Sequence, residues 1–121
     1  MQGLKTYPYA QRIACAGDGF VVEDILMETV DLPYREGADF CIGVNGDSME
    51  PDYSDGDIVY VQRTNSLRPG EVGIFFAEGE CFIKELGRKG LLARNPAYPP
   101  LEDLEDVVCA GRVLGKAERP D

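Results

Sequence analysis

Residues 72–86 read VGIFFAEGECFIKEL, and this stretch determines the fold expected for the chain. Two apolar runs flank the polar triplet Glu78-Gly79-Glu80. Apolar runs of this length around a short loop that contains glycine are typical of an antiparallel β-hairpin. Successive side chains of a strand point to opposite faces, so the second run places Phe82, Lys84 and Leu86 on one face.

The remainder of the chain extends this strand pattern. Apolar runs of strand length are separated by turn signals such as Asn45-Gly46 and Asp55-Gly56-Asp57. The expected strands are 40–44, 58–62, 72–77, 81–86, 91–94 and 107–114. Residues 25–30 fit a short strand or a helical turn, residues 1–19 and 95–100 fit irregular structure, and residues 48–51 fit a short helix. With 121 residues, the chain is long enough for one domain with a core, and we expect a compact, mostly β, antiparallel fold with little helix.

Charge and apolar content exclude several classes of function. The chain has 12 basic and 22 acidic residues, a net charge of −10. Such a surface repels phosphate, so we do not expect this chain itself to bind nucleic acid. No run approaches the roughly 20 apolar residues of a membrane span, and no basic segment followed by an apolar one begins the chain. The expected location is therefore the cytoplasm.

The cysteines favour buried reduced thiols over a metal site or a disulfide framework. They are Cys15, Cys41, Cys81 and Cys109, widely separated and without a C-x-x-C pair. The chain has no histidine, so a zinc site would need all four thiols to converge. Each cysteine lies within an apolar pattern, which is typical of a buried thiol. We expect no metal and no cofactor.

Ser48 and Lys84 form the candidate catalytic pair. A serine needs a base to become nucleophilic, and without histidine that base must be another residue, such as a lysine that burial holds neutral. A free lysine has a pKa of about 10.4, so a base working near neutrality needs a downward shift of about three units, on the order of 4 kcal/mol. From spacing alone, a surface lysine on an edge strand is the favoured alternative.

Three motifs that follow one another along the chain favour the catalytic pair over a surface lysine. They are Gly46-Asp47-Ser48-Met49-Glu50-Pro51, then Tyr53-Ser54-Asp55-Gly56-Asp57-Ile58-Val59, then Phe82-Ile83-Lys84. From about residue 8 to residue 115, the chain resembles the LexA-like self-cleaving serine peptidase domains. These form the C-terminal halves of SOS and phage repressors and of the UmuD mutagenesis proteins. The resemblance implies the LexA C-terminal fold, with Ser48 as nucleophile and Lys84 as general base. It also implies that the N–H groups of Ser48 and Asp47 form the oxyanion hole, and that Met49 lines the cleft.

The resemblance also implies a substrate within the same chain. The family commonly cuts an Ala-Gly bond in a loop before the catalytic domain, and the matching dipeptide here is Ala16-Gly17. The alternative is an ordinary dipeptide in a flexible segment. We therefore expect a linker and cleavage loop over residues 1–19 and a peptidase and dimerisation domain over residues 20–121.

Partners are likewise expectations from the resemblance. Activated RecA filaments stimulate cleavage in many family members, and the C-terminal region, here Val107, Cys109, Gly111 and Val113, contributes to a homodimer. LexA-like repressors bind DNA through a helix-turn-helix domain that residues 1–20 cannot supply, so we expect a fragment of a longer repressor or, alternatively, a short UmuD-like protein. A binding module that retains the fold for dimerisation without proteolysis is the main competing hypothesis. Signal-peptidase-like processing of other proteins shares the dyad chemistry but lacks a membrane anchor.

Overall fold

The computed structural model describes residues 3–12, 26 and 28–118, which form one sheet of nine strands. The sheet order is β2-β1-β3-β4-β9-β5-β6-β7-β8. The strands are β1 Leu4–Ala10, β2 Glu28–Pro33, β3 Phe40–Gly43, β4 Ile58–Gln62, β5 Val72–Ala77, β6 Glu80–Leu86, β7 Gly90–Leu92, β8 Leu101–Glu102 and β9 Val108–Lys116. All neighbouring strands pair antiparallel except β1 and β3, which are parallel.

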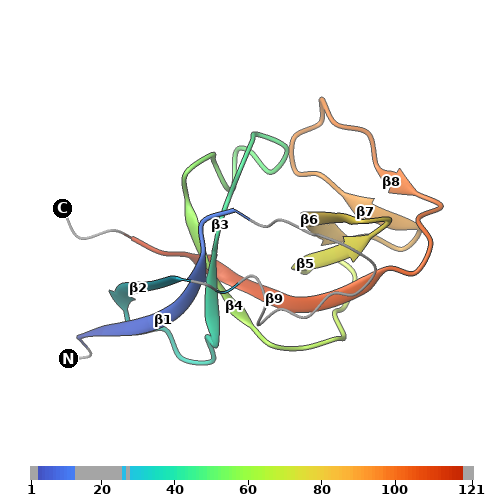
Figure 1. Ribbon diagram of the computed structural model, residues 1–121. Helices are drawn as coiled ribbons and strands as arrows, with labels where there is room; N and C mark the ends of the chain where they lie inside the picture. Colours follow the sequence, from blue (N-terminus) through green and yellow to red (C-terminus); the bar gives the residue numbers. More distant parts are fainter. Residues whose placement is uncertain (1–2, 13–25, 27, 119–121) are drawn as a thin grey trace.

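Strand β9 joins the two halves of the sheet. Its first half pairs with β5, from Val108 opposite Phe76, and its second half pairs with β4, ending at Lys116 opposite Val59. Figure 1 shows β9 running across the molecule, with β1 to β4 on one side and β5 to β8 on the other. The segment that follows β3 and the strand β6 therefore come from different halves of the sheet, and the candidate site lies where they meet.

The sheet buries two apolar clusters, and the larger one joins its two halves. The larger combines β3, β4, β5 and β9 with Met49 and includes Phe40, Ile42, Val61 and Ile74. The smaller lies at the β1 and β2 end and includes Tyr7, Leu32 and Tyr60. Every residue of β5 is buried, which explains its continuous apolar sequence rather than an alternating one.

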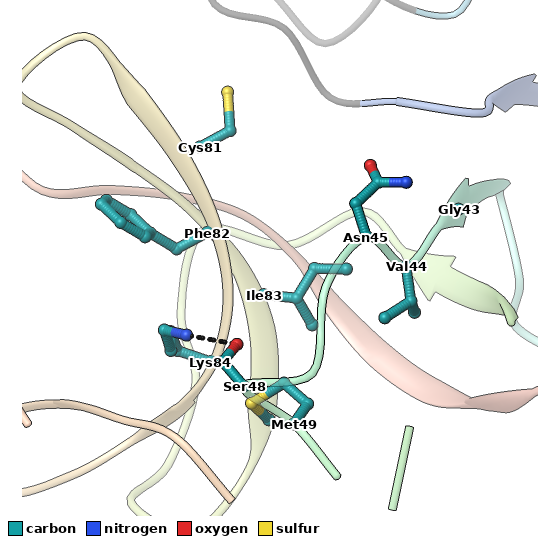
Figure 2. A pocket seen from close by; sticks show the side chains of 9 residues that line it. All are labelled: Gly43, Val44, Asn45, Ser48, Met49, Cys81, Phe82, Ile83 and Lys84. Atoms are coloured by element: carbon teal, nitrogen blue, oxygen red, sulfur yellow. Dashed lines mark hydrogen bonds between the residues drawn. The ribbon is translucent and has the colours of Figure 1, made fainter. Parts of the chain in front are cut away.

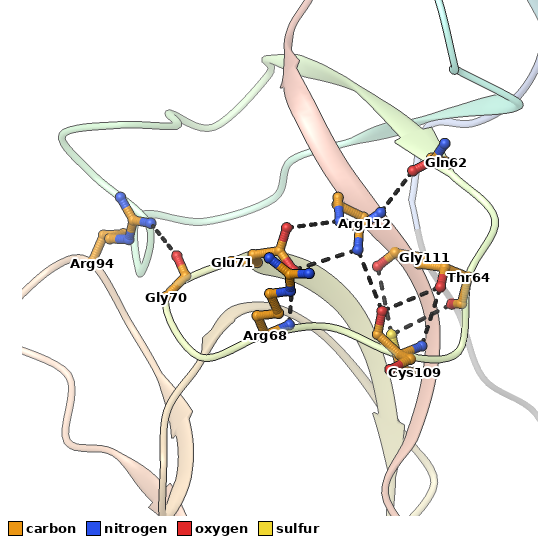
Figure 3. Close-up of polar contacts among 10 residues, drawn as sticks. Gln62, Thr64, Arg68, Gly70, Glu71, Arg94, Cys109, Gly111 and Arg112 are labelled. Atoms are coloured by element: carbon orange, nitrogen blue, oxygen red, sulfur yellow. Dashed lines mark hydrogen bonds and ion pairs between the residues drawn. The ribbon is translucent and has the colours of Figure 1, made fainter.

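Polar contacts of Arg112 fasten the β4–β5 connection to β9 (Figure 3). Its Nε lies 2.9 Å from Glu71 Oε2, and Nη1 donates to Gln62 Oε1 at 2.8 Å. The backbone N–H of Arg68 also donates to the Glu71 carboxylate, and together these bonds lower the Glu71 pKa. An arginine in the middle of β9 thus holds both ends of the connection between its two partner strands.

The predicted mostly β fold is confirmed, with three local corrections. The expectation of irregular structure over residues 1–19 is wrong for Leu4–Ala10, which forms β1 because β2 and β3 supply pairing partners on both edges. The short helix expected over 48–51 is instead a series of turns. The short strand β8 was not expected, since it consists of two residues beside β7. Within the described ranges, no helix has the length and apolar character needed to cross a bilayer.

Candidate active site

Ser48 lies in the turns that connect β3 to β4. Gly46, at φ 85°, starts the turn in a conformation that glycine adopts readily, and its N–H donates to Asp55 Oδ1 at 2.7 Å. The next turn closes through the Glu50 N–H and the Asp47 carbonyl at 3.2 Å. Met49 is only 2% exposed and packs into the larger core cluster. The buried Met49 side chain thereby anchors residues 46–52, which carry the Ser48 hydroxyl and which we name the Ser48 turn.

Lys84 lies on β6, opposite Gly73 of β5. Its Nζ is 2.7 Å from Ser48 Oγ, a hydrogen bond that joins the two halves of the sheet (Figure 2). The lysine is 9% exposed and is the one buried charged residue in the described part of the chain. The alternative of a surface lysine extending from an edge strand is therefore wrong.

Burial lowers the pKa of Lys84 below that of a free lysine, because the ammonium form loses hydration. The centroid of the Tyr98 ring lies 5.9 Å from Lys84 Nζ, at the outer limit of a cation–π contact with the ammonium form. The direction of the pKa shift is set by desolvation. A neutral amine within hydrogen-bond distance of a serine hydroxyl can accept its proton.

Ser48 and Lys84 line two cavities. The first has a volume of about 260 Å³ and is lined by β3 and β6 together with the Ser48 turn. Its lining residues are Gly43, Val44, Asn45, Ser48, Met49, Cys81, Phe82, Ile83 and Lys84 (Figure 2). The second, of about 340 Å³, also contains Ser48 and Lys84 but is bounded by Tyr98, Pro99 and Leu101. The Ser48–Lys84 contact thus lies in the wall shared by two hollows, an arrangement suited to a chain segment that passes over it.

A loop after β7 contacts the Ser48 turn directly. The Asn95 N–H donates to the Ser48 carbonyl at 3.0 Å, and Asn95 Nδ2 donates to the Asp47 carbonyl at 3.1 Å. The Tyr98 hydroxyl donates to Asp47 Oδ1. Sequence reasoning assigned this loop only irregular structure. The signal that could have identified it is Asn95 before Pro96, because asparagine forms side-chain turns in such positions.

Arg94 ties the same loop to both sides of the site. Its guanidinium pairs with Asp52 in the Ser48 turn. Its Nε lies 2.7 Å from Glu85 Oε1 on β6, next to Lys84, although the alignment is that of an ion pair and not of a hydrogen bond. These side chains are partly exposed, so we assign the pairs an orienting role and little net stability.

The cysteines differ from the expectation of four reduced thiols. Cys41 and Cys109 are free, and burial raises the pKa of the Cys41 thiol to about 12, so it is inert at neutral pH. Cys81, at the rim of the first cavity, is disulfide-bonded, and for this residue the prediction of a reduced thiol is wrong. Position in an apolar strand cannot distinguish the two states, because pairing depends on which cysteine lies opposite in space.

The structure therefore brings four of the predicted site residues together: Ser48, Lys84, Asp47 and Met49. The predicted cleavage site, Ala16 and Gly17, lies outside the described residues.

Comparison with known proteins identifies the family of the chain. Residues 8–114 match the model of the family described as Peptidase S24-like. The LexA repressor of Nocardioides sp. is 34% identical over 120 residues, which cover 93% of this chain and 48% of that protein. LexA repressor 2 of Pseudomonas putida is 39% identical over 74 residues, or 57% of this chain and 37% of that protein. The chain thus spans about half or less of the length of these relatives. Because the family match covers most of its residues, the chain belongs to the Peptidase S24-like family and is a LexA-like domain.

Proposed function

We propose that this chain is a self-cleaving serine peptidase domain in which Ser48 is the nucleophile and Lys84 the general base. The observation that carries the proposal is the 2.7 Å contact between Lys84 Nζ and Ser48 Oγ, made by a lysine that is only 9% exposed. A buried lysine with a lowered pKa provides the neutral amine that this chemistry needs. Membership of a peptidase family supports the same reaction class.

In the proposed reaction, neutral Lys84 Nζ accepts the proton of Ser48 Oγ as the oxygen adds to the carbonyl carbon of Ala16. The resulting oxyanion accepts hydrogen bonds from backbone N–H groups. When the intermediate collapses, the C–N bond breaks and Lys84 returns its proton to the Gly17 nitrogen. A water molecule then cleaves the acyl-Ser48 ester, with Lys84 again accepting and returning a proton. The products are a chain ending in the Ala16 carboxylate and a chain beginning with the Gly17 amine.

The Ser48 and Asp47 N–H groups are the proposed oxyanion donors. Within the part of the chain that the structure describes, neither N–H donates a hydrogen bond. Donors left free beside a nucleophile are available to a developing negative charge. This supports the assignment.

The path of the chain supports Ala16–Gly17 as the bond cut in the same molecule. Strand β1 ends with Ala10 paired to Ile42 of β3. The carbonyl of Gln11 then packs so closely against Gly43 that a Cβ there would come within 2.3 Å of its oxygen. Gly43 lines the first cavity, so the chain is already at the rim of the site at residue 11. Five further residues reach up to about 17 Å when extended, enough to enter the cavity.

The role of the parent protein is part of the same proposal. Similarity to LexA repressors supports a transcriptional repressor in the DNA-damage response. Self-cleavage would inactivate this repressor, and RecA filaments would stimulate the cleavage. DNA binding would then come from a helix-turn-helix domain elsewhere in the protein. We also propose a homodimer. Two valines next to each other support it: Val107, just before β9, is 41% exposed, and Val108, the first residue of β9, is 52% exposed. Sedimentation equilibrium of the purified chain distinguishes this dimer from a monomer.

The direct test is intact mass over time at about pH 9–10, where an ordinary lysine begins to lose its proton. Samples are reduced before analysis, because Cys81 is disulfide-bonded and the shorter product contains Cys15. We expect products 1–16 and 17–121, and a loss of at least about 10³-fold in rate for Ser48→Ala and for Lys84→Ala. An unmodified chain that stays intact, with and without RecA filaments, would favour the non-proteolytic binding module. Cleavage at another bond would contradict only the Ala16–Gly17 assignment.

A further inference from the structure

The segment from Arg94 to Tyr98, which we name the clamp segment, makes four polar contacts with the Ser48 turn. Two are hydrogen bonds from Asn95, through its backbone N–H to the Ser48 carbonyl and through Nδ2 to the Asp47 carbonyl. The Tyr98 hydroxyl binds the Asp47 carboxylate, and Arg94 pairs with Asp52. Among the described residues, Asn95 donates the one hydrogen bond to the Ser48 carbonyl, and the Asp47 carbonyl accepts from Asn95 Nδ2 and from the Glu50 N–H of its own turn.

These contacts determine how the Ser48 backbone is oriented. A trans peptide is planar, with its C=O and N–H pointing in opposite directions. Asn95 Nδ2 holds the Asp47 carbonyl, so the Ser48 N–H in the same peptide must point away from Asn95. The Asn95 N–H holds the following carbonyl, that of Ser48 itself. Both peptides that flank the Ser48 Cα are thereby restrained, and with them the direction of its side chain.

Asn95 is itself preorganised for this task. Its Oδ1 accepts a hydrogen bond from the Ala97 N–H at 2.9 Å, which fixes the side-chain amide in a local turn. The remaining Nδ2 group is then directed to Asp47. The turn and the contact with Asp47 use different atoms of one side chain, so a substitution can separate them.

We propose that Asn95 is a positioning residue of the active site, holding the Asp47–Ser48 and Ser48–Met49 peptides so that the Ser48 hydroxyl and N–H are directed at the same reacting carbonyl. The inference rests on the proposed function for its chemistry. Tyr98 reinforces it by holding the Asp47 side chain, while its ring lies near Lys84 Nζ.

The test compares Asn95→Ser with the parent chain. Serine keeps a short oxygen acceptor for the Ala97 N–H but has no group long enough to replace Nδ2. The probe is a fluorophosphonate, which phosphonylates Ser48 Oγ with loss of fluoride while Lys84 takes the hydroxyl proton. Its phosphonyl oxygen takes the place of the oxyanion, so the labelling rate reports nucleophile orientation whether or not the chain cuts itself. Labelling is followed by intact mass from neutral to alkaline pH, with Ser48→Ala as the site control.

We expect Asn95→Ser to lower the plateau labelling rate on the order of 10–100-fold, the cost of a small misplacement of reacting groups. The midpoint of the pH profile should not move, because Asn95 contacts the Ser48 turn and not Lys84. Asn65→Ser is the matched control, since Asn65 is exposed and lines neither cavity, and its profile should equal that of the parent. Tyr98→Phe is the second variant if Asn95→Ser does not fold, and it should lower the plateau severalfold while its ring stays beside Lys84.

An unchanged plateau in Asn95→Ser, or a lower plateau with a shifted midpoint, would overturn the positioning role. A parent chain whose Ser48 takes up no label at any pH would also overturn it, because no oriented nucleophile then exists. If the parent labels at Ser48 and responds to Asn95→Ser as expected but does not cleave itself, the positioning role stands and the proposed self-cleavage fails.

Discussion

At the scale of single residues, the surroundings of Lys84 disfavour its charged form. Burial lowers its pKa, and its hydrogen-bond partner is the neutral hydroxyl of Ser48. An ammonium in such a place destabilises the fold relative to the unfolded chain, where the same group is fully hydrated. The residue therefore links the proposed chemistry to stability.

This linkage predicts how Lys84→Met should change stability with pH. Between the lowered pKa of the folded state and about 10.4 in the unfolded state, the unfolded chain binds the extra proton, so the parent gains stability as pH rises. Below that window both states are protonated and the penalty is constant. The free energy of unfolding of Lys84→Met relative to the parent should therefore be highest near neutral pH and fall as pH approaches about 10.4. Urea denaturation of both proteins from pH 7 to 10.5 measures it, and a pH-independent difference would contradict burial of the charge.

The pair Ser48 and Lys84 could be predicted from sequence because each lies in a motif of adjacent residues. Asn95 and Tyr98 could not, although they contact the same turn. Both contact Asp47, which lies about 50 residues earlier in the sequence. The geometry of the two loops brings them together, and a local sequence pattern does not reveal that geometry. The same holds for the disulfide-bonded state of Cys81, which no local sequence pattern indicates.

At the scale of elements, the backbones of β4 and β9 approach closely where β9 passes from β5 to β4. Gly111 lies at this crossing, opposite Ile74. A Cβ on Gly111 would come within 2.4 Å of Val61 Cγ1 and 2.9 Å of the Gln62 carbonyl oxygen. The backbone of β4 cannot move aside as the end of a flexible side chain can. Any larger residue at position 111 must therefore push β4 and β9 apart.

We therefore expect Gly111→Ala to lower the free energy of unfolding by about 1–3 kcal/mol, the usual cost of overpacking. Gly3→Ala is the control, because a Cβ at Gly3 meets nothing within 4 Å, and it should change stability by less than about 0.5 kcal/mol. Urea denaturation of the two variants and the parent measures both. Equal stability of Gly111→Ala and the parent would mean that the crossing is looser than described.

Elements with local apolar patterns could be predicted from the sequence almost to the residue. Strands β4 and β5 match the predicted ranges 58–62 and 72–77. Strand β1 could not be predicted, because Tyr7-Pro8-Tyr9 has a weak strand pattern and forms a strand through its pairing with β2 and β3. The predicted helix over 48–51 failed because burial of Met49 and the hydrogen bonds of the Asp47 turn outweigh a local capping signal.

At the scale of the whole molecule, the sheet places Ser48 from one half within hydrogen-bond distance of Lys84 from the other. The β1 strand leads the chain to the rim of the same cavity, beside Gly43. In the proposed account, one polypeptide supplies nucleophile, base and substrate. Cleavage is then a first-order event whose rate is limited by how much Lys84 is neutral.

The pH dependence of the self-cleavage rate tests this account most directly. First-order rate constants are measured by intact mass after reduction, from about pH 6 to 11, for the parent and for Lys84→Ala. We predict a rate that rises about tenfold per pH unit and then reaches a plateau, with a midpoint below about 10.4, because burial lowers the pKa of Lys84. Lys84→Ala should lack this titration. A parent rate that is flat over the range, or that keeps rising with hydroxide and is matched by Lys84→Ala, would contradict the assignment of Lys84 as the base for Ser48.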